Sequence, residues 1–413
     1  MRVLWLSHFV PWPATGLGML QRSHALLREA SRRFEIHLVA LNHAGLLESD
    51  RVEEARSELS GFCAAVDVFA RRGGESQPVR TARLLRSAVG STPYDVQWMA
   101  CPPLSAFLEE LRPRPDLVHV DTIGLAAHAE RLGEVPQVLN HHNVESALLR
   151  RRASRERGWP ARRFLAREAA KLERLERRVA PRARVNLVVS PLDGERLAAV
   201  APGARQRVVA NGVDTRYFAA QPSDGSAGLI FAGGMDWYPN RDAALFFVRE
   251  IWPLLRRRLP GLSATFVGRS PPEELVEASR RGPLRAPGFV YDVRPFVRDA
   301  AIYVCPIRDG GGTRLKVLDA LAMERPLVAT ALAVEGLGLR EEREYLRAES
   351  AEEFVSQITR LVGQPALRAA LARAGRRAVC SRFDWPVVGE SLAAAYHEAL
   401  DQPREGVPCP IAS

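Results

Sequence analysis

The chain contains 413 residues, of which 46% are hydrophobic and 26% are charged, and its formal net charge is +10. This length exceeds one ordinary hydrophobic core, so we expect two domains of about 200 residues. The five cysteines have no CxxC spacing, which argues against a disulfide framework or a zinc site and fits a reducing cytosol. No apolar run is long enough for a secretory signal or a membrane span, so a cytoplasmic protein is expected.

A positive net charge of this size is compatible with a nucleic acid, an anionic membrane or an acidic substrate as partner. Only Lys171 and Lys316 are lysines among the 58 basic residues, and we attribute the arginine excess to background composition, so no nucleic-acid partner is expected. The mainly helical stretch 144–179 carries many of the arginines. A solvated helix face is the first interpretation of them, and a peripheral contact with an anionic membrane surface is the second.

The chain opens as a strand at 2–7, a loop that ends at Gly18, and a helix that begins at Met19. The order is that of a dinucleotide-binding fold, but Gly16-Leu-Gly18 lacks the third glycine and the loop is too long for that motif. A glycine loop still follows the first strand, where open α/β sheets bind ligands. Further apolar runs alternate with helical patterns and predict a mostly parallel sheet. These runs are 36–41, 65–69, 117–120, 135–139, 185–189 and 207–210.

Residues 221–228 are rich in proline, serine and glycine and are the best linker candidate. A second alternating series begins at Leu229, so the sequence predicts an α/β protein of two Rossmann-like, doubly wound domains over 1–220 and 229–386. A last helix at 387–401 and a tail at 402–413 complete the chain. The expected strands of the second half are 229–232, 263–267, 286–290, 302–306, 327–330 and 344–346, and its other helices are 240–257, 351–362 and 366–380.

Residues 302–329 follow the order strand, glycine loop, helix, strand, with Gly310–Gly312 just before a helix that begins near Thr313. The free N–H groups of a first helical turn, approached through glycines, suit an anion such as phosphate. Helical spacing aligns Gly312, Lys316 and Asp319 on one stripe. The alternative is that Lys316 and Asp319 form an ordinary surface pair.

A second glycine loop, Gly233-Gly234, also follows a strand and precedes a helix. If both strands belong to one parallel sheet, the two loops open on the same edge and can share a diphosphate. Asp319 can then accept hydrogen bonds from ribose hydroxyls, while Lys316 or Arg314 meets developing phosphate charge. The alternative is that the glycines serve only to form tight turns and bind no ligand.

In the first half, His119 and Asp121 end one expected strand, and the polar run Asn140–Glu145 ends the next. Adjacent strands would bring these side chains together, which favours a binding site over ordinary buried histidines. The sequence contains no HExxH, no GxSxG and no helical carboxylate and histidine set, so we expect no metal.

The sequence resembles the retaining, nucleotide-sugar-dependent glycosyltransferases of the GT-B fold, family 4. The resemblance extends from the first strand to about residue 401, and the block that begins at Gly310 is its most specific part. The segments that carry it are Phe231-Ala-Gly-Gly-Met-Asp-Trp-Tyr-Pro-Asn240, Asn211-Gly-Val-Asp214, Pro287-Gly-Phe-Val290 and Gly310-Gly-Gly-Thr-Arg-Leu-Lys-Val-Leu-Asp-Ala-Leu-Ala322.

The resemblance implies two facing Rossmann-like domains, with the acceptor mainly in the first, the nucleotide sugar in the second, and a last helix that crosses back to the first. It implies sugar transfer with retention, with no bound metal and no cofactor beyond the nucleotide sugar as co-substrate. Loop amides and basic side chains would stabilise the leaving diphosphate, which can itself take the acceptor proton.

The motifs and the resemblance together give three sets of candidate residues. By position, His142 would lie near the donor sugar, Val290 would offer its backbone to the nucleobase, and Asp319 would hold the ribose. The catalytic candidates are His142, Lys316 and Arg314, and the acceptor-side candidates are His119, Asp121, Asn143 and Glu145. The donor-binding candidates are Gly16, Gly18, Gly233, Gly234, Val290, Asp309, Gly310, Gly311, Gly312, Thr313, Leu315 and Asp319.

Two departures from the family pattern concern the donor sugar. Gly311 stands where the first glutamate of a paired-acid motif is expected, so the usual contact with sugar hydroxyls is missing or is made by Asp309. The second acid is Asp319, which is one methylene shorter than glutamate. The arginine and lysine that many members carry after the Gly233 strand are also absent, so Arg314 and Lys316, with Arg241 as a third candidate, would have to offset the phosphate charge.

We therefore expect a glycosyltransferase that moves a hexose-type sugar from a UDP-, GDP- or dTDP-linked donor to a hydroxyl of a glycan, a lipid-linked or a small-molecule acceptor. Two alternatives stay open. One is a nucleotide-sugar epimerase or hydrolase on the same fold, and the other is a non-catalytic basic protein that binds a membrane surface or a partner.

Overall fold

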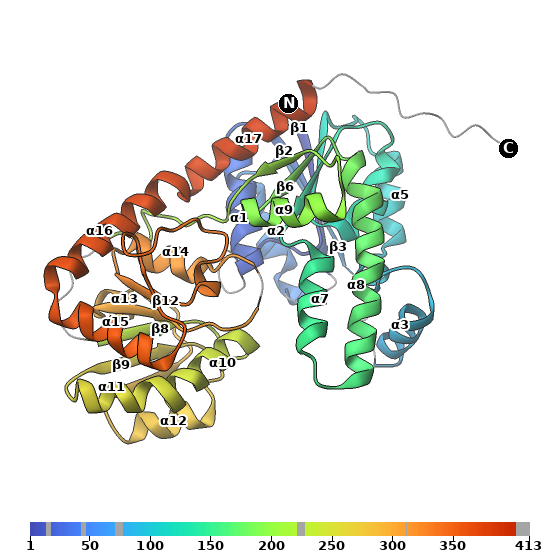
Figure 1. Cartoon of the computed structure of the whole chain (residues 1–413). Coiled ribbons are helices and arrows are strands. Elements are labelled where there is room, and N and C mark those ends of the chain that lie inside the picture. The colour runs from blue at the N-terminus through green and yellow to red at the C-terminus, as the bar shows by residue number, and fades with distance from the viewer. Residues whose placement is uncertain (14–17, 43–46, 71–76, 221–227, 311, 402–413) are drawn as a thin grey trace. The chain divides into compact units, whose positions relative to one another are not determined.

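The structure is a computed structural model that describes residues 1–13, 18–42, 47–70, 77–220, 228–310 and 312–401 (Figure 1). The chain divides into two compact units. Unit 1 is the chain up to Val209 together with the chain from Gly389 onward, and unit 2 runs from Ala210 to Val388. The linker predicted at 221–228 lies outside the described residues except for Gly228, which begins a strand, and the tail predicted at 402–413 lies outside them entirely.

Unit 1 contains a seven-stranded sheet in the order β3-β2-β1-β4-β5-β6-β7, and every neighbouring pair is parallel. Its central strands are buried, as expected for apolar runs covered on both faces. The order reverses direction at β1 and β4, and ligands of such sheets bind at the carboxyl ends near this switch point. The strands are β1 (Arg2–Ser7), β2 (Glu35–Asn42), β3 (Ala65–Ala70), β4 (Leu117–Val120), β5 (Gln137–His141), β6 (Val185–Val188) and β7 (Gln206–Val208).

The helices of unit 1 connect these strands. The long stretch expected at 144–179 is a pair of helices, α7 and α8, which separate just before Gly158 and Pro160. The helices are α1 (Gly18–Ser31), α2 (Val52–Ser60), α3 (Gln77–Val89), α4 (Tyr94–Met99), α5 (Pro102–Glu110), α6 (Ala126–Ala129), α7 (Glu145–Arg155), α8 (Trp159–Val179) and α9 (Pro191–Val200), with 3-10 turns η1 (Ser49–Arg51), η2 (Ile123–Leu125), η3 (Glu130–Leu132) and η4 (Ala180–Arg182).

Unit 2 contains a six-stranded parallel sheet in the order β10-β9-β8-β11-β12-β13. Its strands are β8 (Gly228–Ala232), β9 (Ser263–Val267), β10 (Leu284–Gly288), β11 (Ile302–Cys305), β12 (Leu327–Ala329) and β13 (Leu346–Arg347). Its helices are α10 (Tyr238–Phe246), α11 (Trp252–Arg258), α12 (Glu273–Arg280), α13 (Arg294–Arg298), α14 (Leu315–Ala322), α15 (Ala351–Gly363) and α16 (Pro365–Arg382), with the 3-10 turn η6 (Leu332–Val334). The prediction of two doubly wound Rossmann-like domains is confirmed.

The helix expected at 240–257 is interrupted by a π turn, η5 (Phe247–Ile251), between α10 and α11. Pro253 is the second residue of α11. Proline has no N–H to donate and its ring clashes with the carbonyl one turn earlier, so the backbone widens just before it.

The last helix, α17 (Trp385–Asp401), has its first four residues in unit 2 and the rest in unit 1. Within unit 1, Tyr396 is fully buried and its hydroxyl lies 2.8 Å from His119 Nδ1. Its ring packs 5.3 Å from that of Phe34, so the helix contributes to the core of unit 1. Among the residues described, no helix combines the length and the apolar character needed to cross a membrane.

Candidate active site

Two loops of unit 2 leave the sheet at the carboxyl ends of neighbouring strands. Because β8 and β11 pair in parallel, Gly233-Gly234 and the segment after Cys305 lie at the same edge. Gly233 N donates to the Val267 carbonyl at 2.8 Å. A Cβ at position 268 would overlap the Gly233 carbonyl, so glycine at Gly268 lets the two backbones approach closely.

The Lys316 side chain joins the two loop regions. Lys316 is the second residue of α14, and its Nζ donates a hydrogen bond to Asn240 Oδ1. The same ammonium lies 4.7 Å from the ring centroid of Phe231, and Asn240 Nδ2 donates to the Gly234 carbonyl at 2.7 Å. A Cβ on Gly233 would collide with Lys316 Nζ, so the ammonium lies against the first glycine loop.

The loop before α14 is held by its own side chains. Gly310 and Gly312 have φ values of 104° and 75°, which glycine adopts without strain. Asp309 Oδ1 accepts from the Gly310 N–H at 2.5 Å, and Arg314 donates to the carbonyls of Gly312 and Asp309. Thr313 Oγ1 is buried and has no hydrogen-bond partner among the described residues, which makes this hydroxyl available to a ligand.

Lys316 and Asp319 do not form the surface pair that helical spacing offers. Lys316 bonds to Asn240 instead, and no hydrogen bond or ion pair joins the Asp319 carboxylate to any residue that the structure describes. Burial raises the pKa of Asp319 to about 7, although the charge of Lys316 lowers it in part. Burial also lowers the pKa of Lys316 to about 8. Both side chains are therefore poised near neutral pH, and the carboxylate has a free hydrogen-bonding capacity.

The remaining donor-side candidates are placed as follows. Val290 follows β10 and packs in part against the core of unit 2, and Leu315 is the first residue of α14. Gly18 is the first residue of α1 in unit 1. Gly16 and Gly311 lie outside the described residues.

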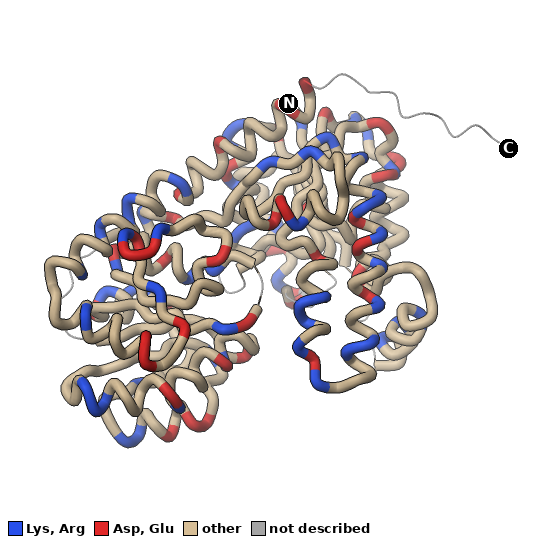
Figure 2. Tube along the Cα trace, viewed as in Figure 1, with Lys and Arg blue, Asp and Glu red and all other residues tan. Residues whose placement is uncertain are grey.

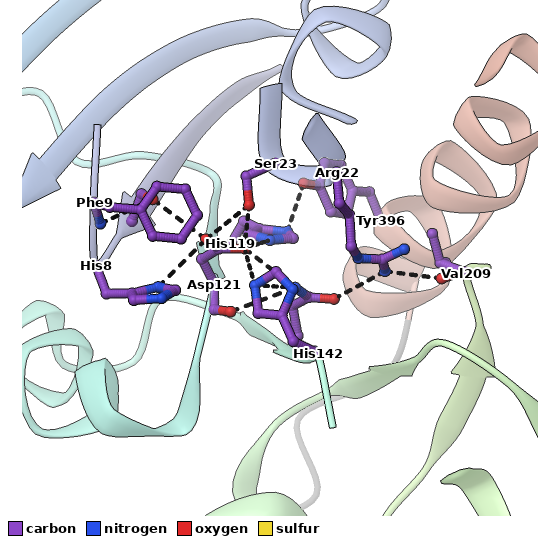
Figure 3. A network of polar contacts seen from close by, with 11 residues as sticks. His8, Phe9, Arg22, Ser23, His119, Asp121, His142, Val209 and Tyr396 are labelled. Atoms are coloured by element: carbon purple, nitrogen blue, oxygen red, sulfur yellow. Dashed lines mark hydrogen bonds and ion pairs between the residues drawn. The ribbon is translucent and has the colours of Figure 1, made fainter. Parts of the chain in front are cut away.

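The polar network of unit 1 is centred on Asp121, which is fully buried directly after β4 (Figure 3). Its carboxylate accepts hydrogen bonds from Ser23 at 3.1 Å, from Asn140 at 3.1 Å and from Ser7 at 3.3 Å. His142 Nε2 lies 3.2 Å from the Asp121 carboxylate. The ends of β1, β4 and β5 therefore converge on one carboxylate, as neighbouring parallel strands allow.

Two more histidines flank this carboxylate in different ways. His8 Nδ1 lies 3.7 Å from Asp121 Oδ2, and the side chain keeps 14% of its surface exposed. His119 is closed off from solvent, because its ring stacks on Trp5 at 3.7 Å and its Nδ1 lies 2.8 Å from the Tyr396 hydroxyl. His119, an acceptor-side candidate, thus supports Asp121 from within the core.

The environment of Asp121 favours its ionised form. Burial alone raises the pKa of Asp121, but the charge of His142 and the nearby imidazoles of His119, His142 and His8 outweigh it and hold the pKa well below its ordinary value. Burial lowers the pKa of His8 and of His119. At neutral pH a buried carboxylate therefore lies beside two neutral imidazoles and can orient the imidazole of His142.

His8, Asp121 and His142 also have the composition of a metal-ligand set. Their ligating atoms all lie within 4.8 Å of one another, and imidazole and carboxylate groups are ligands of zinc and similar ions. Hydrogen bonds from Ser23 and Asn140 already satisfy the Asp121 carboxylate. His8 Nδ1 and His119 Nε2 are buried and have no hydrogen-bond partner among the described residues.

The two other acceptor-side candidates lie at the start of α7. Asn143 is partly buried, and Glu145 is the first residue of the helix. Burial raises the pKa of Glu145 to about 8, and the charges of Asp95 and Glu176 raise it further. The Glu145 carboxyl is therefore part of a group of acids from α4, α7 and α8.

Several residues of the two networks were not among the candidates from sequence. His8 follows β1 directly, and the rule that selected the ends of the other strands applies to it equally. Ser23 and Asn240 contribute from helices, and only the packing of α1 and α10 against the sheets brings them to the site. Asn240 ends the segment Phe231–Asn240 that carries the family resemblance, whereas no local signal in the sequence marks Ser23.

Comparison with known proteins identifies the class. The model described as Glycosyltransferase Family 4 matches residues 18–217, and the model described as Glycosyl transferases group 1 matches residues 226–364. Glycogen synthase of Mycobacterium tuberculosis is 27% identical over 318 residues, which cover 71% of this chain and 72% of that protein.

Solved structures agree on the fold. Sucrose-phosphate synthase from Thermosynechococcus elongatus has a TM-score of 0.68 at 17% identity, covering 96% of this chain and 99% of that chain. HepE from Anabaena, in complex with UDP, has a TM-score of 0.65 at 14% identity, covering 96% and 100%. With the two family matches, this makes the class plain: the chain belongs to the family 4, group 1 glycosyltransferases of the GT-B fold. The family resemblance is confirmed.

Replacing Glu145 by Gln should raise the melting temperature increasingly as pH rises from about 4.5 to about 8. The folded protein holds this group neutral up to a pKa of about 8, whereas the unfolded chain ionises it near 4.5, so folding loses stability through that window. Gln cannot ionise and avoids the loss. Thermal unfolding of both proteins at pH 5 and pH 8 provides the measurement, and equal shifts at both pH values would contradict this assignment.

Proposed function

We propose that the chain transfers a hexose-type sugar, with retention of anomeric configuration, from a UDP-, GDP- or dTDP-linked donor to a hydroxyl acceptor. The observation that carries the proposal is the position of the Lys316 ammonium, against Gly233 and at the start of α14. A cation, a glycine backbone and the free amides of a helix N-terminus form a site for a diphosphate. Solved structures of HepE contain UDP and UDP-glucose, which supports a nucleoside diphosphate sugar as donor.

Each donor part has a proposed partner in unit 2. Lys316 and Arg314 offset the diphosphate charge, so no metal ion is needed on the phosphates. Asp319 accepts hydrogen bonds from the ribose hydroxyls, since no hydrogen bond or ion pair joins its carboxylate to a described residue. The backbone at Val290 contacts the nucleobase. Asp309 contacts the hydroxyls of the donor sugar in place of the glutamate that the family motif has at position 311.

The reaction exchanges one bond to the anomeric carbon for another. The bond from this carbon to the diphosphate oxygen breaks, and a bond to the acceptor oxygen forms on the same face of the sugar. The acceptor proton passes to the leaving phosphate oxygen, so the atoms and charges balance. Negative charge grows on the diphosphate in the transition state, and a preorganised cation such as Lys316 stabilises that charge.

In unit 1, His142 is proposed to bind the donor sugar. Its imidazole is oriented by the contact with Asp121 and keeps 14% of its surface exposed, so it can reach a ligand. Asn143 and Glu145 serve the acceptor, which is a glycan, a lipid-linked or a small-molecule hydroxyl. The four described cysteines are free thiols, which fits the reducing cytoplasm proposed as the location.

Replacing Lys316 by Ala should lower turnover by roughly 10² to 10³, the usual effect of removing one transition-state charge contact. The assay incubates the protein with a panel of UDP-, GDP- and dTDP-sugars and measures donor consumption with and without acceptor hydroxyls. Arg249→Ala is the matched control, since Arg249 forms an exposed pair with Glu274. Unchanged turnover in Lys316→Ala would remove the role of Lys316. If the folded protein neither bound nor consumed any nucleotide sugar of the panel, the proposed function itself would fail.

Binding of the preferred nucleoside diphosphate should be tightest between about pH 7 and pH 8. Below about pH 7 Asp319 is protonated and loses a ribose acceptor, and above about pH 8 Lys316 loses the charge that attracts phosphate. Titration calorimetry at several pH values measures both limbs. Asp319→Asn should remove the loss of affinity at acidic pH, and Lys316→Ala should remove the loss at alkaline pH. A loss of affinity caused by titration of the nucleotide itself would persist in both variants. Persistence of a limb in its variant would refute that assignment.

A further inference from the structure

Helix α3 in unit 1 buries two polar residues, Arg83 and Ser87, and leaves its large apolar side chains exposed. Arg83 and Ser87 keep 7% and 0% of their surface exposed. Leu85 and Val89 keep 65% and 80%. Pro78, Ala82, Leu85 and Val89 are all exposed and follow helical spacing, so they form one apolar stripe along the helix. We call these four residues the α3 stripe.

Polar contacts with α8 fix this orientation. Ser87 Oγ donates to Glu168 Oε1 at 2.8 Å, and Lys171 Nζ donates to the Ser87 carbonyl. Arg167 donates to the Val89 carbonyl at 3.1 Å. The helix lies beside α8 in Figure 1. Rotation of α3 to bury its stripe would break the buried hydrogen bonds that join Ser87 to Glu168 and Lys171.

Helix α8, which contacts α3, and helix α7, which packs on α8, carry basic residues and one exposed aromatic ring. Trp159, the first residue of α8, is 70% exposed, and the guanidinium of Arg163 lies 5.8 Å from its ring centroid. Residues 150–167 contain eight arginines and a single acid, Glu156. Residues 77–89 add the exposed Arg80 and Arg86 and no acid. Figure 2 shows the basic positions along α7 and α8.

We propose that the α3 stripe and Trp159 dock onto an anionic lipid bilayer. Leucine, valine and tryptophan side chains enter the boundary between headgroups and acyl chains, as in helices that lie in the membrane interface. The surrounding arginines bind lipid phosphates. A second copy of the chain is a poorer occupant, because a symmetric contact on this surface would bring two arginine-rich rims together.

This inference goes beyond the proposed function, since the stripe and the diphosphate site belong to separate units. Membrane docking predicts no dependence on nucleotide, and nucleotide binding predicts no dependence on lipid. Failure of either proposal therefore leaves the other untouched.

Flotation with vesicles tests the proposal on the full chain. Wild-type protein should float with vesicles of phosphatidylcholine mixed with phosphatidylglycerol and should remain behind with phosphatidylcholine alone. High salt should weaken the binding, because screening reduces the arginine contribution. The double variant Leu85→Glu, Val89→Glu should bind at least about tenfold more weakly, because it replaces two inserted side chains by charges that the anionic surface repels.

The matched control is Tyr291→Glu, which places the same charge at a side chain of unit 2 that is 97% exposed, and it should float as the wild type does. Unchanged melting temperatures show that the variants are folded. Absence of wild-type flotation, or equal flotation of the double variant, would overturn the proposal. A dimer in light scattering that the double variant abolishes would also overturn it in favour of a second copy.

Discussion

The hydrogen bond from Lys316 to Asn240 is the contact on which the candidate donor site depends. It ties the first turn of α14 to the first turn of α10, and Asn240 passes the constraint to the Gly234 carbonyl. The ammonium is thereby held against a glycine, where a larger residue would collide with it. A lysine in these surroundings loses part of its hydration, which lowers its pKa to about 8.

Unit 1 uses the opposite charge in a similar way. Asp121 is a buried carboxylate whose hydrogen-bond donors come from β1, α1, β5 and the residue after β5. Burial would favour its neutral form, but those donors and the neighbouring imidazoles keep its pKa low. Each unit thus places one partly desolvated charge at the carboxyl edge of its sheet, which is where α/β sheets bind ligands.

The sequence predicted the features that depend on local patterns. Alternating apolar runs predicted both parallel sheets, and the glycine loops before α10 and α14 were located correctly because glycine spacing is local. The π turn before Pro253 was missed, since periodicity alone cannot show where a ladder of hydrogen bonds widens. The Lys316–Asp319 pair, offered by spacing as an alternative, is replaced by a contact with a residue 76 positions away. The burial of His119 and the outward stripe of α3 likewise depend on tertiary contacts.

The central claim is that the Gly233 loop and the start of α14 bind a diphosphate, and amide hydrogen exchange tests it most directly. Exchange is measured with and without a saturating nucleoside diphosphate that binds the protein. We predict slower exchange in peptides that cover Gly233-Gly234 and Gly312–Lys316, because their N–H groups donate to phosphate oxygens. Unchanged exchange in both peptides, with protection elsewhere in the bound protein, would contradict the account.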